Sequence, residues 1–386
     1  MKNKIIGLIK KNIMTLAYYL FRVFPIRKNK IVFSSFLGKG YGDNGKAICD
    51  RLLNDEKQYE IVWLCREMSD DFPDGIRKTA YYSVRSIYEQ VTAKVWIDNR
   101  RKPGYVRKRK GQFYINTNHG NMGIKRLEFD AKEALGKDYL EVALNDSKMI
   151  DLYLSGSKFE TRYLRKAFRY DGEVLECGYP RQDKLFNPSK AEIKGIKATL
   201  GIPDAYNVLL YAPTFRANMT PDDLSVYNID WDKTLSAMEN RFHNKWVGLI
   251  RLHPNISALS KELDIPNSVI DVSNYPDFEE LVLVSDCLIS DYSSTAIEAA
   301  IVNKMVFLYA TDIESYKKDR NFIIELEKFP YCLCKSNAEL EKSIQAYSEE
   351  EYQKKRNDFF KNEYELCSTG TATDIVVDRI RSVIDK

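Results

Sequence analysis

Residues 115–130 of the chain read INTNHGNMGIKRLEFD, and they follow directly on a short apolar run, Phe113–Ile115. Apolar residues that give way to small polar residues and then a histidine indicate a strand that delivers the imidazole into a loop. Open α/β sheets carry their active sites at the carboxyl ends of the strands, so we expect His119 at such an end. Lys125 and Arg126 follow closely enough for their cationic groups to share a pocket with the imidazole.

Such a pocket suits a phosphorylated substrate that is attacked by a hydroxyl group. Histidine takes up a proton near neutral pH, and two cations hold an anion in place. The alternative interpretation is an ordinary loop histidine beside solvated charges, and this stretch alone does not decide between the two.

Strand-like runs and helical stretches alternate on both sides of this segment, which indicates mostly parallel sheets covered by helices. The runs of the first half are Lys30–Phe36, Glu60–Cys65, Val95–Asp98, Phe113–Ile115, Asp151–Leu154 and Val174–Cys177. Those of the second half are Asn207–Ala212, Lys245–Ile250, Val284–Ile289 and Met305–Tyr309. Turn residues cluster between about 180 and 205, so we expect one domain over 30–185 and another over 200–386.

Polar residues follow each of the four strands expected in the second half. They are Thr214 and Arg216; Arg251, His253 and Asn255; Ser290, Asp291, Ser293, Ser294 and Thr295; and Asp312. Hydroxyls and backbone amides at a helix start suit an anion, arginines suit a pyrophosphate, and a histidine suits a leaving phosphate. Ordinary helix caps and a His-Pro turn are the alternative interpretation.

Two of the three histidines, His119 and His253, follow apolar strands in opposite halves of the chain. Two facing Rossmann-like domains with one such histidine each would close a central cleft around a nucleotide diphosphate and an acceptor. His243 precedes its strand, so we expect it to be structural or exposed.

A glycine-rich loop, Gly38–Gly45, nearly matches two nucleotide-binding motifs. Its glycines fit G-x-G-x-x-G, but the next strand ends in Arg66 rather than in an acid that binds a ribose. It nearly forms a Walker A loop, but Ala47 replaces the hydroxyl residue that binds magnesium. What remains is a loop whose backbone amides meet a ligand, or simply a turn.

Charge is distributed unevenly along the chain, although the net charge is only +4 from 59 basic and 55 acidic residues. Residues 1–29 contain lysines, arginines and many apolar residues but no acid. We expect an amphipathic segment at an anionic membrane interface, because lysines interrupt it too often for a spanning helix. The alternative is a terminal helix docked on the core with a solvated basic face.

Nucleic-acid binding and metal binding are not expected. The basic runs 100–102 and 107–110 suit a solvated loop, an anionic lipid or a phosphate-rich polymer equally well. The seven cysteines lack the spacing of a zinc site.

Several motifs, taken in their order along the chain, resemble the CDP-glycerol glycerophosphotransferase family, which contains the teichoic acid primases and polymerases. The motifs are Asn116–Asp130, Pro213–Arg216, Arg251–Pro254, Ser290–Ser294, Asp312–Arg320, Gly38–Asn44, Gly178–Asp183 and Gly370–Ala372.

The resemblance implies a GT-B-type fold at the cytoplasmic face of the cell membrane, with no metal and no cofactor. It implies transfer of glycerol phosphate or ribitol phosphate from a CDP-alditol to a hydroxyl of a lipid-linked teichoic acid or capsular polymer, with release of CMP. His119 would be the base, and His253 and Asp291 would act with it. The donor would meet Thr214, Arg216, Arg251, Asn255, Ser290, Ser293, Ser294 and Thr295, and the acceptor or a phosphate would meet Gly120, Lys125, Arg126 and Asp130.

The histidine motif is longer than the commonest His-Gly-Thr-Pro-Leu-Lys-Lys form of the family, and this leaves the alignment of Lys125 and Arg126 open. One alternative function is a GT-B glycosyltransferase that uses a nucleotide-sugar. Retaining members carry two spaced glutamates, and Glu298 has no acidic partner eight residues later. The other alternative is a non-catalytic polymer-binding protein, which would tolerate the loss of His119. The identity of the alditol and the oligomeric state stay open.

Overall fold

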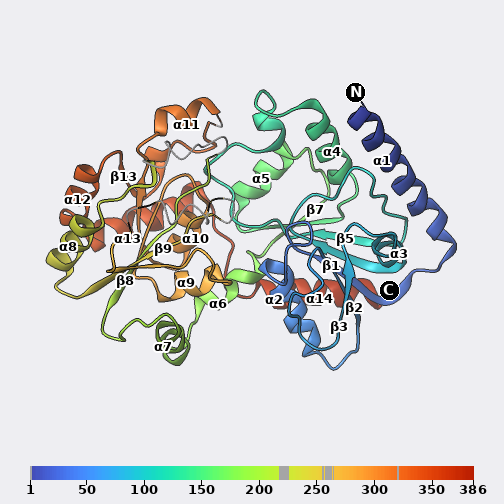
Figure 1. The fold of residues 1–386 in the computed structure, drawn as a ribbon, viewed down its shortest axis with the longest axis horizontal. Helices are drawn as coiled ribbons and strands as arrows, with labels where there is room; N and C mark the ends of the chain where they lie inside the picture. The colour runs from blue at the N-terminus through green and yellow to red at the C-terminus, as the bar shows by residue number, and fades with distance from the viewer. Residues whose placement is uncertain (1, 217–225, 254–255, 257–262, 264, 320) are drawn as a thin grey trace. The chain divides into compact units, whose positions relative to one another are not determined.

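The computed structural model describes residues 2–216, 226–253, 256, 263, 265–319 and 321–386. Contacts divide the chain into two compact units, each built on one parallel sheet (Figure 1). Unit 1 comprises Met1–His119, Leu127–Asp183 and Leu366–Lys386, and unit 2 comprises Gly120–Arg126 and Lys184–Glu365. The expected α/β class with two Rossmann-like sheets is confirmed, whereas the cleft expected between them stays a prediction.

The sheet of unit 1 has seven strands in the order β3-β2-β1-β4-β5-β6-β7, and all neighbours are parallel. Its first six positions follow the doubly wound order 3-2-1-4-5-6, so the strand order reverses between β1 and β4, where ligands commonly bind. The strands are β1 (Arg27–Ser34), β2 (Glu60–Cys65), β3 (Ile76–Ala80), β4 (Ala93–Asp98), β5 (Phe113–Asn116), β6 (Leu152–Ser155) and β7 (Glu173–Glu176).

Helices cover both faces of this sheet, because parallel strands are joined by crossover connections that usually contain a helix; here β2–β3 and β4–β5 are joined by loops instead. The helices are α1 (Lys2–Leu20), α2 (Asp43–Leu53), α3 (Val84–Thr92), α4 (Lys137–Ser147), α5 (Lys158–Ala167) and α14 (Ala372–Ile384), with 3-10 turns η1 (Phe21–Val23), η2 (Glu128–Ala131) and η3 (Pro180–Gln182). Ser83 and Ser157 begin α3 and α5 by accepting a hydrogen bond from the N–H three residues later.

The sheet of unit 2 has six parallel strands in the order β10-β9-β8-β11-β12-β13, which is again the doubly wound order, with its reversal between β8 and β11. The strands are β8 (Asn207–Tyr211), β9 (Trp246–Ile250), β10 (Val269–Asp271), β11 (Cys287–Ser290), β12 (Met305–Tyr309) and β13 (Cys332–Cys334). The helices are α6 (Asp183–Phe186), α7 (Lys190–Thr199), α8 (Trp231–Phe242), α9 (Phe278–Val284), α10 (Thr295–Ile301), α11 (Ile313–Asp319), α12 (Asn337–Gln345) and α13 (Glu349–Asp358), with η6 (Leu326–Lys328) and a π-turn η7 (Phe359–Glu363).

The contact-defined units differ from the expected domains, 30–185 and 200–386, in two segments. Helix α14 belongs to unit 1, where Val376, Val377 and Ile380 are fully buried in the same apolar cluster as Phe33 and Trp63. In Figure 1 this red helix runs beside α2, far from it in sequence. Burial of its apolar face explains the return of the chain to unit 1.

The second exchanged segment is Gly120–Arg126, which leaves unit 1 directly after His119 and belongs to unit 2. The N–H of Ile323 donates to the Ile124 carbonyl at 2.7 Å, and the N–H of Arg126 donates to the Asn321 carbonyl at 3.2 Å. The segment is thus held by backbone hydrogen bonds of the kind that join strands.

Strands β3, β10 and β13 were not expected from the sequence. β3 carries charged residues, Arg77 and Lys78, and β10 and β13 have three residues each. Edge strands of this kind lack the apolar run by which the central strands are recognised.

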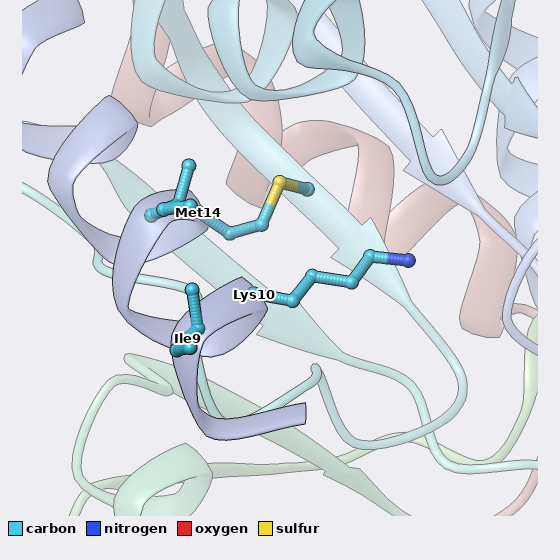
Figure 2. A pocket seen from close by; sticks show the side chains of 4 residues that line it. Ile9, Lys10 and Met14 are labelled. Carbon is cyan, nitrogen blue, oxygen red and sulfur yellow. The ribbon is translucent and has the colours of Figure 1, made fainter. Parts of the chain in front are cut away.

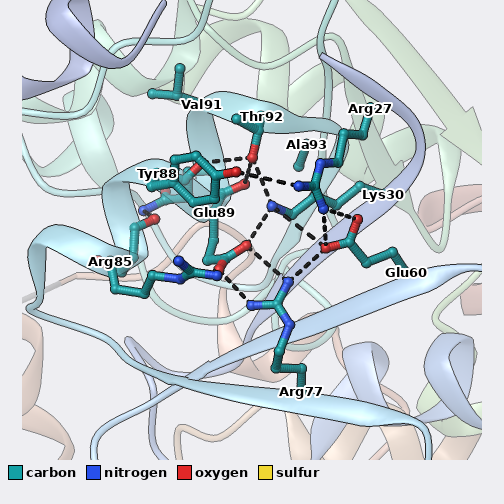
Figure 3. A network of polar contacts seen from close by, with 12 residues as sticks. Arg27, Lys30, Glu60, Arg77, Arg85, Tyr88, Glu89, Val91, Thr92 and Ala93 are labelled. Atoms are coloured by element: carbon teal, nitrogen blue, oxygen red, sulfur yellow. Dashed lines mark hydrogen bonds and ion pairs between the residues drawn. The ribbon is translucent and has the colours of Figure 1, made fainter. Parts of the chain in front are cut away.

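A buried ion network lies at the amino-terminal end of the sheet in unit 1 (Figure 3). Lys30 of β1 and Glu89 of α3 are fully buried and form an ion pair. Arg77 of β3 donates to both Glu89 and Glu60, and Arg85 contacts Glu89 at 2.6 Å. Because two buried charges alone would be unfavourable, the surrounding partners are what make this arrangement stable.

Helix α1 packs on unit 1 by one face only. Tyr18 is fully buried, and the hydroxyl of Thr15 donates to the Tyr105 carbonyl at 3.3 Å. The opposite face exposes an apolar stripe at helical spacing, with exposed fractions of 42–62% in Ile9, Ile13, Leu16, Leu20 and the following Phe24. A surface hollow beside it is lined by Ile9, Lys10, Ile13 and Met14 (Figure 2).

Helix α1 is thus docked on unit 1, and its exposed side carries apolar residues as well as lysine; the membrane-interface role expected for it stays a prediction. Among the described residues, no helix combines the length and the apolar character needed to cross a bilayer.

Candidate active site

His119 lies where the sequence predicts it, just past the carboxyl end of β5. The N–H of Thr117 donates to the Asp98 carbonyl at the end of β4 at 2.9 Å, and the N–H of Asn118 donates to the side chain of Asn116 at 2.9 Å. Asn118 has a left-handed backbone, with φ 56°. This turn leaves the backbone buried and His119 exposed.

Two side chains from other loops of unit 1 hold this turn by its carbonyl groups. The amide of Asn44, at the start of α2, donates to the carbonyls of Asn118 at 3.0 Å and of Thr117 at 3.5 Å. Arg181 donates from its guanidinium to the His119 carbonyl at 3.4 Å, and its backbone N–H donates to the Asn44 side-chain oxygen at 3.1 Å. Asn44 itself is fully buried.

Asp43 and Phe36 complete the surroundings of this turn. Burial raises the pKa of the Asp43 carboxyl, and Arg181, 3.9 Å away, opposes the rise. Phe36 lies edge-on to the His119 ring, with centroids 6.0 Å apart. Phe36 and Leu37 have left-handed φ values of 44° and 59°, which are strained for residues with a side chain and of the kind found beside active sites; Gly38, with φ 88°, continues the turn without strain.

The four residues expected on the acceptor side are divided between the two units. Gly120, Lys125 and Arg126 belong to unit 2, where the guanidinium of Arg126 donates to the Phe322 carbonyl at 3.1 Å. Asp130 belongs to unit 1 and pairs with Lys166 at 2.9 Å. The contact-defined units thus divide these four residues, all of which fall within the domain expected over 30–185.

In unit 2 the expected polar edge is present, because β9, β8, β11 and β12 are neighbours in the sheet and end at the same edge. The N–H of Thr214, after β8, donates to the Asp291 carboxylate, after β11, at 2.8 Å. Asp291 also accepts from the Tyr292 N–H at 2.6 Å and pairs with Arg216 at 2.8 Å. Asp291 thus joins the two loops at the point where the strand order reverses.

Arg216 is held by two carboxylates. It forms two hydrogen bonds with Asp312, at 2.7 and 2.9 Å, one ion pair with Asp291, and one hydrogen bond with the Thr214 carbonyl at 2.6 Å. Its side chain is 11% exposed and lies over the Tyr292 ring at 4.6 Å. Burial alone would lower the pKa of this guanidinium, but the two carboxylates raise it.

The geometry therefore makes Arg216 a brace between strand-end loops, whereas the sequence suggested a pyrophosphate contact. The hydroxyl of Tyr292 donates to Asp312 at 2.8 Å and adds to the same brace.

Hydroxyl groups at the end of β11 and directly after it are partly engaged in hydrogen bonds within the protein. Ser290 donates to the Ala212 carbonyl at 2.7 Å and lies 3.3 Å from the Thr295 hydroxyl. Ser293 accepts from the Thr295 N–H at 3.3 Å, and Ser294 precedes α10 without a side-chain cap. Within the part of the chain that the structure describes, the buried hydroxyl oxygen of Thr214 has no hydrogen-bond partner, so it is a candidate ligand contact.

The residues after β9 lie near the same edge. His253 is exposed and stacks on Phe215, with ring centroids 5.4 Å apart. Arg251 donates to the Tyr275 carbonyl at 2.7 Å, and burial lowers the pKa of its guanidinium. Asn255, also expected here, lies outside the described residues.

Sequence reasoning missed Asn44, Arg181 and Tyr292. Asn44 and Arg181 lie in motifs that the sequence analysis singled out, but for the loop that contains Asn44 it considered a nucleotide, backbone contacts to a ligand, or a turn, and no role for the Asn44 side chain. Across the described residues, no three His, Cys, Asp or Glu side chains are grouped so that they could hold a metal ion.

Comparisons with known proteins agree with the arrangement of motifs. The family model for CDP-glycerol:poly(glycerophosphate) glycerophosphotransferases matches residues 16–382. The teichoic acid poly(glycerol phosphate) polymerase of Bacillus subtilis (strain 168) is 30% identical over 91% of this chain and 48% of its own length. The chain thus spans about half the length of that polymerase.

Two further similarities extend over most of both chains. The teichoic acid glycerol-phosphate transferase of Staphylococcus aureus (strain NCTC 8325 / PS 47) is 30% identical over 85% of this chain and 85% of its own. The solved structure of a variant of the wall teichoic acid polymerase TagF, soaked with CDP-glycerol, superposes on this chain with a TM-score of 0.85 and is 30% identical in sequence. That match covers 99% of this chain and 96% of the TagF chain.

Proposed function

Because the chain belongs to the CDP-glycerol:poly(glycerophosphate) glycerophosphotransferase family, we propose that it transfers an alditol phosphate from a CDP-alditol to a polymer hydroxyl and releases CMP. The observation that carries this proposal is the similarity to the TagF structure soaked with CDP-glycerol, at 30% identity over nearly the whole chain. Glycerol phosphate is the favoured group, and ribitol phosphate is the alternative, since a teichoic acid ribitol-phosphate primase is 26% identical to this chain.

Unit 2 supplies the donor site in this proposal. The Thr214 hydroxyl, which has no hydrogen-bond partner among the described residues, and the serine hydroxyls at the reversal of the strand order are suited to bind phosphate oxygens and alditol hydroxyls. Arg251 donates to a carbonyl rather than to a carboxylate, so its charge is better placed than that of Arg216 to attract the pyrophosphate. Arg216 and Asp291 shape the site by joining the loops.

His119 acts as the general base in the proposed reaction. Its imidazole takes the proton of the acceptor hydroxyl while that oxygen attacks the phosphorus next to the alditol. A new phosphorus–oxygen bond forms, and the bond between this phosphorus and the oxygen of the CMP phosphate breaks in line. His253 donates a hydrogen bond or a proton to the leaving CMP phosphate, and Lys125 and Arg126 bind acceptor or donor phosphates.

A lipid-linked teichoic acid or capsular polymer is the proposed acceptor, at the cytoplasmic face of the cell membrane. Support comes from α1, whose outer face carries the apolar stripe from Ile9 to Leu20 and is flanked by exposed Lys10. Such a helix lies in the interface, with its apolar face among acyl chains and its lysines at anionic headgroups. The alternative is burial of this stripe between copies of the chain.

CMP release from CDP-glycerol and, separately, from CDP-ribitol tests the proposal, with a lipid-linked acceptor and with the His119→Ala variant as comparison. We expect acceptor-dependent CMP release from one donor and its loss in the variant, with donor affinity largely kept. Sugar transfer from a nucleotide-sugar, with no release from either CDP-alditol, would establish the glycosyltransferase alternative. Equal polymer binding by both proteins without any transfer would support the non-catalytic alternative.

A further inference from the structure

The catalytic-base candidate occupies an unusual place in the chain, because His119 is the last residue of unit 1 before the chain enters unit 2. Gly120 begins the segment that unit 2 holds, and its φ of 149° is a conformation that L side chains rarely adopt. The same segment is fixed in unit 2 by hydrogen bonds at Ile124 and Arg126 and by the Tyr364 hydroxyl, which donates to the Met122 carbonyl at 2.8 Å. Any displacement of this segment would therefore pull on the His119 backbone.

Hydrogen bonds to three successive carbonyl groups fix the backbone of this turn within unit 1. The carbonyls of Thr117 and Asn118 accept from Asn44, and that of His119 accepts from Arg181. Asn44 and Arg181 are joined to each other by a hydrogen bond of 3.1 Å. Because buried amide hydrogen bonds are costly to leave unmade, this arrangement favours a single backbone position for His119.

Building on the proposed function, we infer that Asn44 and Arg181 are positioning residues that clamp the His119 turn to unit 1. The glycine-rich loop then has a role other than nucleotide binding: it places Asn44 at the start of α2, beneath the turn. The side chains of Asp43 and Asn44 are buried and turned towards Arg181 and the turn. The Asn44 side chain of this loop thus donates to carbonyl groups of the protein itself, and the loop has a role that needs no bound phosphate.

The clamp matters for chemistry because a general base works only within hydrogen-bond reach of the proton it removes. A displacement of about 1 Å in a reacting group lowers a rate by roughly 10²-fold. We therefore expect Asn44→Ala and Asn44→Asp to lower kcat by about 10²-fold and to leave the KM for the CDP-alditol within about twofold. Asn44→Asp keeps the oxygen that accepts from Arg181 but loses the amide that donates to the turn.

A double-mutant cycle with His119→Ala separates positioning from general stability. If Asn44 acts through His119, Asn44→Ala should cause no further loss in the His119→Ala background. Asn54→Ala is the matched control, since Asn54 lies at the other end of α2 and its amide donates to the Asp50 carbonyl at 2.8 Å. The control should leave kcat unchanged.

Hydrogen exchange gives a second measurement that does not depend on activity. Peptides that span residues 115–122 should exchange about tenfold faster in Asn44→Ala and in Arg181→Ala than in the native protein, while peptides from α5 keep their protection. Arg181→Lys keeps the positive charge beside Asp43, so its kcat for CMP release should lie between those of Arg181→Ala and the native protein.

Two results would overturn this inference. One is an equal loss of rate on Asn44→Ala in the native and His119→Ala backgrounds, and the other is unchanged exchange of the 115–122 peptides. The proposed function can fail separately. If the native protein releases no CMP, but the 115–122 peptides exchange faster in Asn44→Ala and Arg181→Ala, the proposed function is refuted and the structural role of Asn44 and Arg181 remains.

Discussion

Replacement of Arg216 by lysine tests whether this residue is a brace or a phosphate ligand. Lysine keeps the positive charge but presents one compact ammonium group in place of the planar fork. Arg216 has four contacts with protein groups, two to Asp312, one to Asp291 and one to the Thr214 carbonyl. An ammonium group cannot reproduce the paired contact to Asp312 together with the others, so one carboxylate loses its partner.

The size of the effect follows from burial. Side chains of Asp291 and Asp312 are 2% and 17% exposed, so neither carboxylate is well solvated. Hydrogen bonds to charged groups contribute about 1.5–3 kcal/mol each, and complete removal of one partner of a buried pair costs about 3–5 kcal/mol. Because lysine retains the charge, we expect a loss of about 2–4 kcal/mol in the free energy of unfolding of unit 2, and a fall in Tm of roughly 5–15 °C.

Thermal unfolding and calorimetric titration with CDP-glycerol measure the two effects separately. Arg251→Lys is the matched control, because Arg251 donates to the Tyr275 carbonyl and should affect donor affinity more than stability. If Arg216→Lys leaves Tm within about 1 °C of the native value but abolishes donor binding, Arg216 binds the pyrophosphate directly and the brace is refuted.

Three further predictions concern the buried charges and α1. Burial alone would raise the pKa of Glu89, but hydrogen bonds from Arg77 and Lys30 lower it to about 2. The stability that Glu89 contributes is therefore present above pH 4.5 and is lost as the pH falls towards 2. Glu89→Gln should reduce this loss of stability at acid pH, as measured by urea unfolding, and should cost about 3 kcal/mol at neutral pH. Burial raises the pKa of Asp146 to about 7, so stability should decline as pH rises from 3.8 to about 7, by at most about 4 kcal/mol, and Asp146→Asn should remove the decline. The double variant Ile13→Glu, Leu16→Glu should bind phosphatidylglycerol vesicles about tenfold or more weakly than the native protein. Asn12→Glu, on the same helix, should have a smaller effect. Unchanged binding of the double variant would contradict the interfacial role of α1.

The sequence predicts the central strands and the polar edge of unit 2 well, for a physical reason. Buried parallel strands such as β8 and β12 need nearly continuous apolar runs, and the polar residues that follow them lie at one edge of the sheet. Position along the chain therefore predicts proximity in space for Thr214, Asp291 and Asp312.

Long-range packing decides the features that sequence reasoning missed. Nothing local in Gly120–Arg126 or in α14 indicates which unit holds it, because the groups that hold them, the backbone of 321–324 and the apolar cluster of unit 1, are far away in sequence. The same limit applies to Arg216, since an arginine at a strand end gives no sign of whether its counter-charge is a protein carboxylate or a ligand phosphate. Asn44 was missed because a buried amide that binds carbonyl groups has no characteristic spacing in sequence.

The fate of the phosphorus atom next to the alditol tests the central claim most directly. CDP-glycerol radiolabelled at that phosphorus is supplied with the lipid-linked acceptor, and nucleotide and polymer products are separated. Attack at phosphorus predicts that the label passes to the polymer and that the nucleotide product is unlabelled CMP. Label retained in a CDP product, with unlabelled glycerol transferred to the polymer, would show attack at carbon and contradict the account.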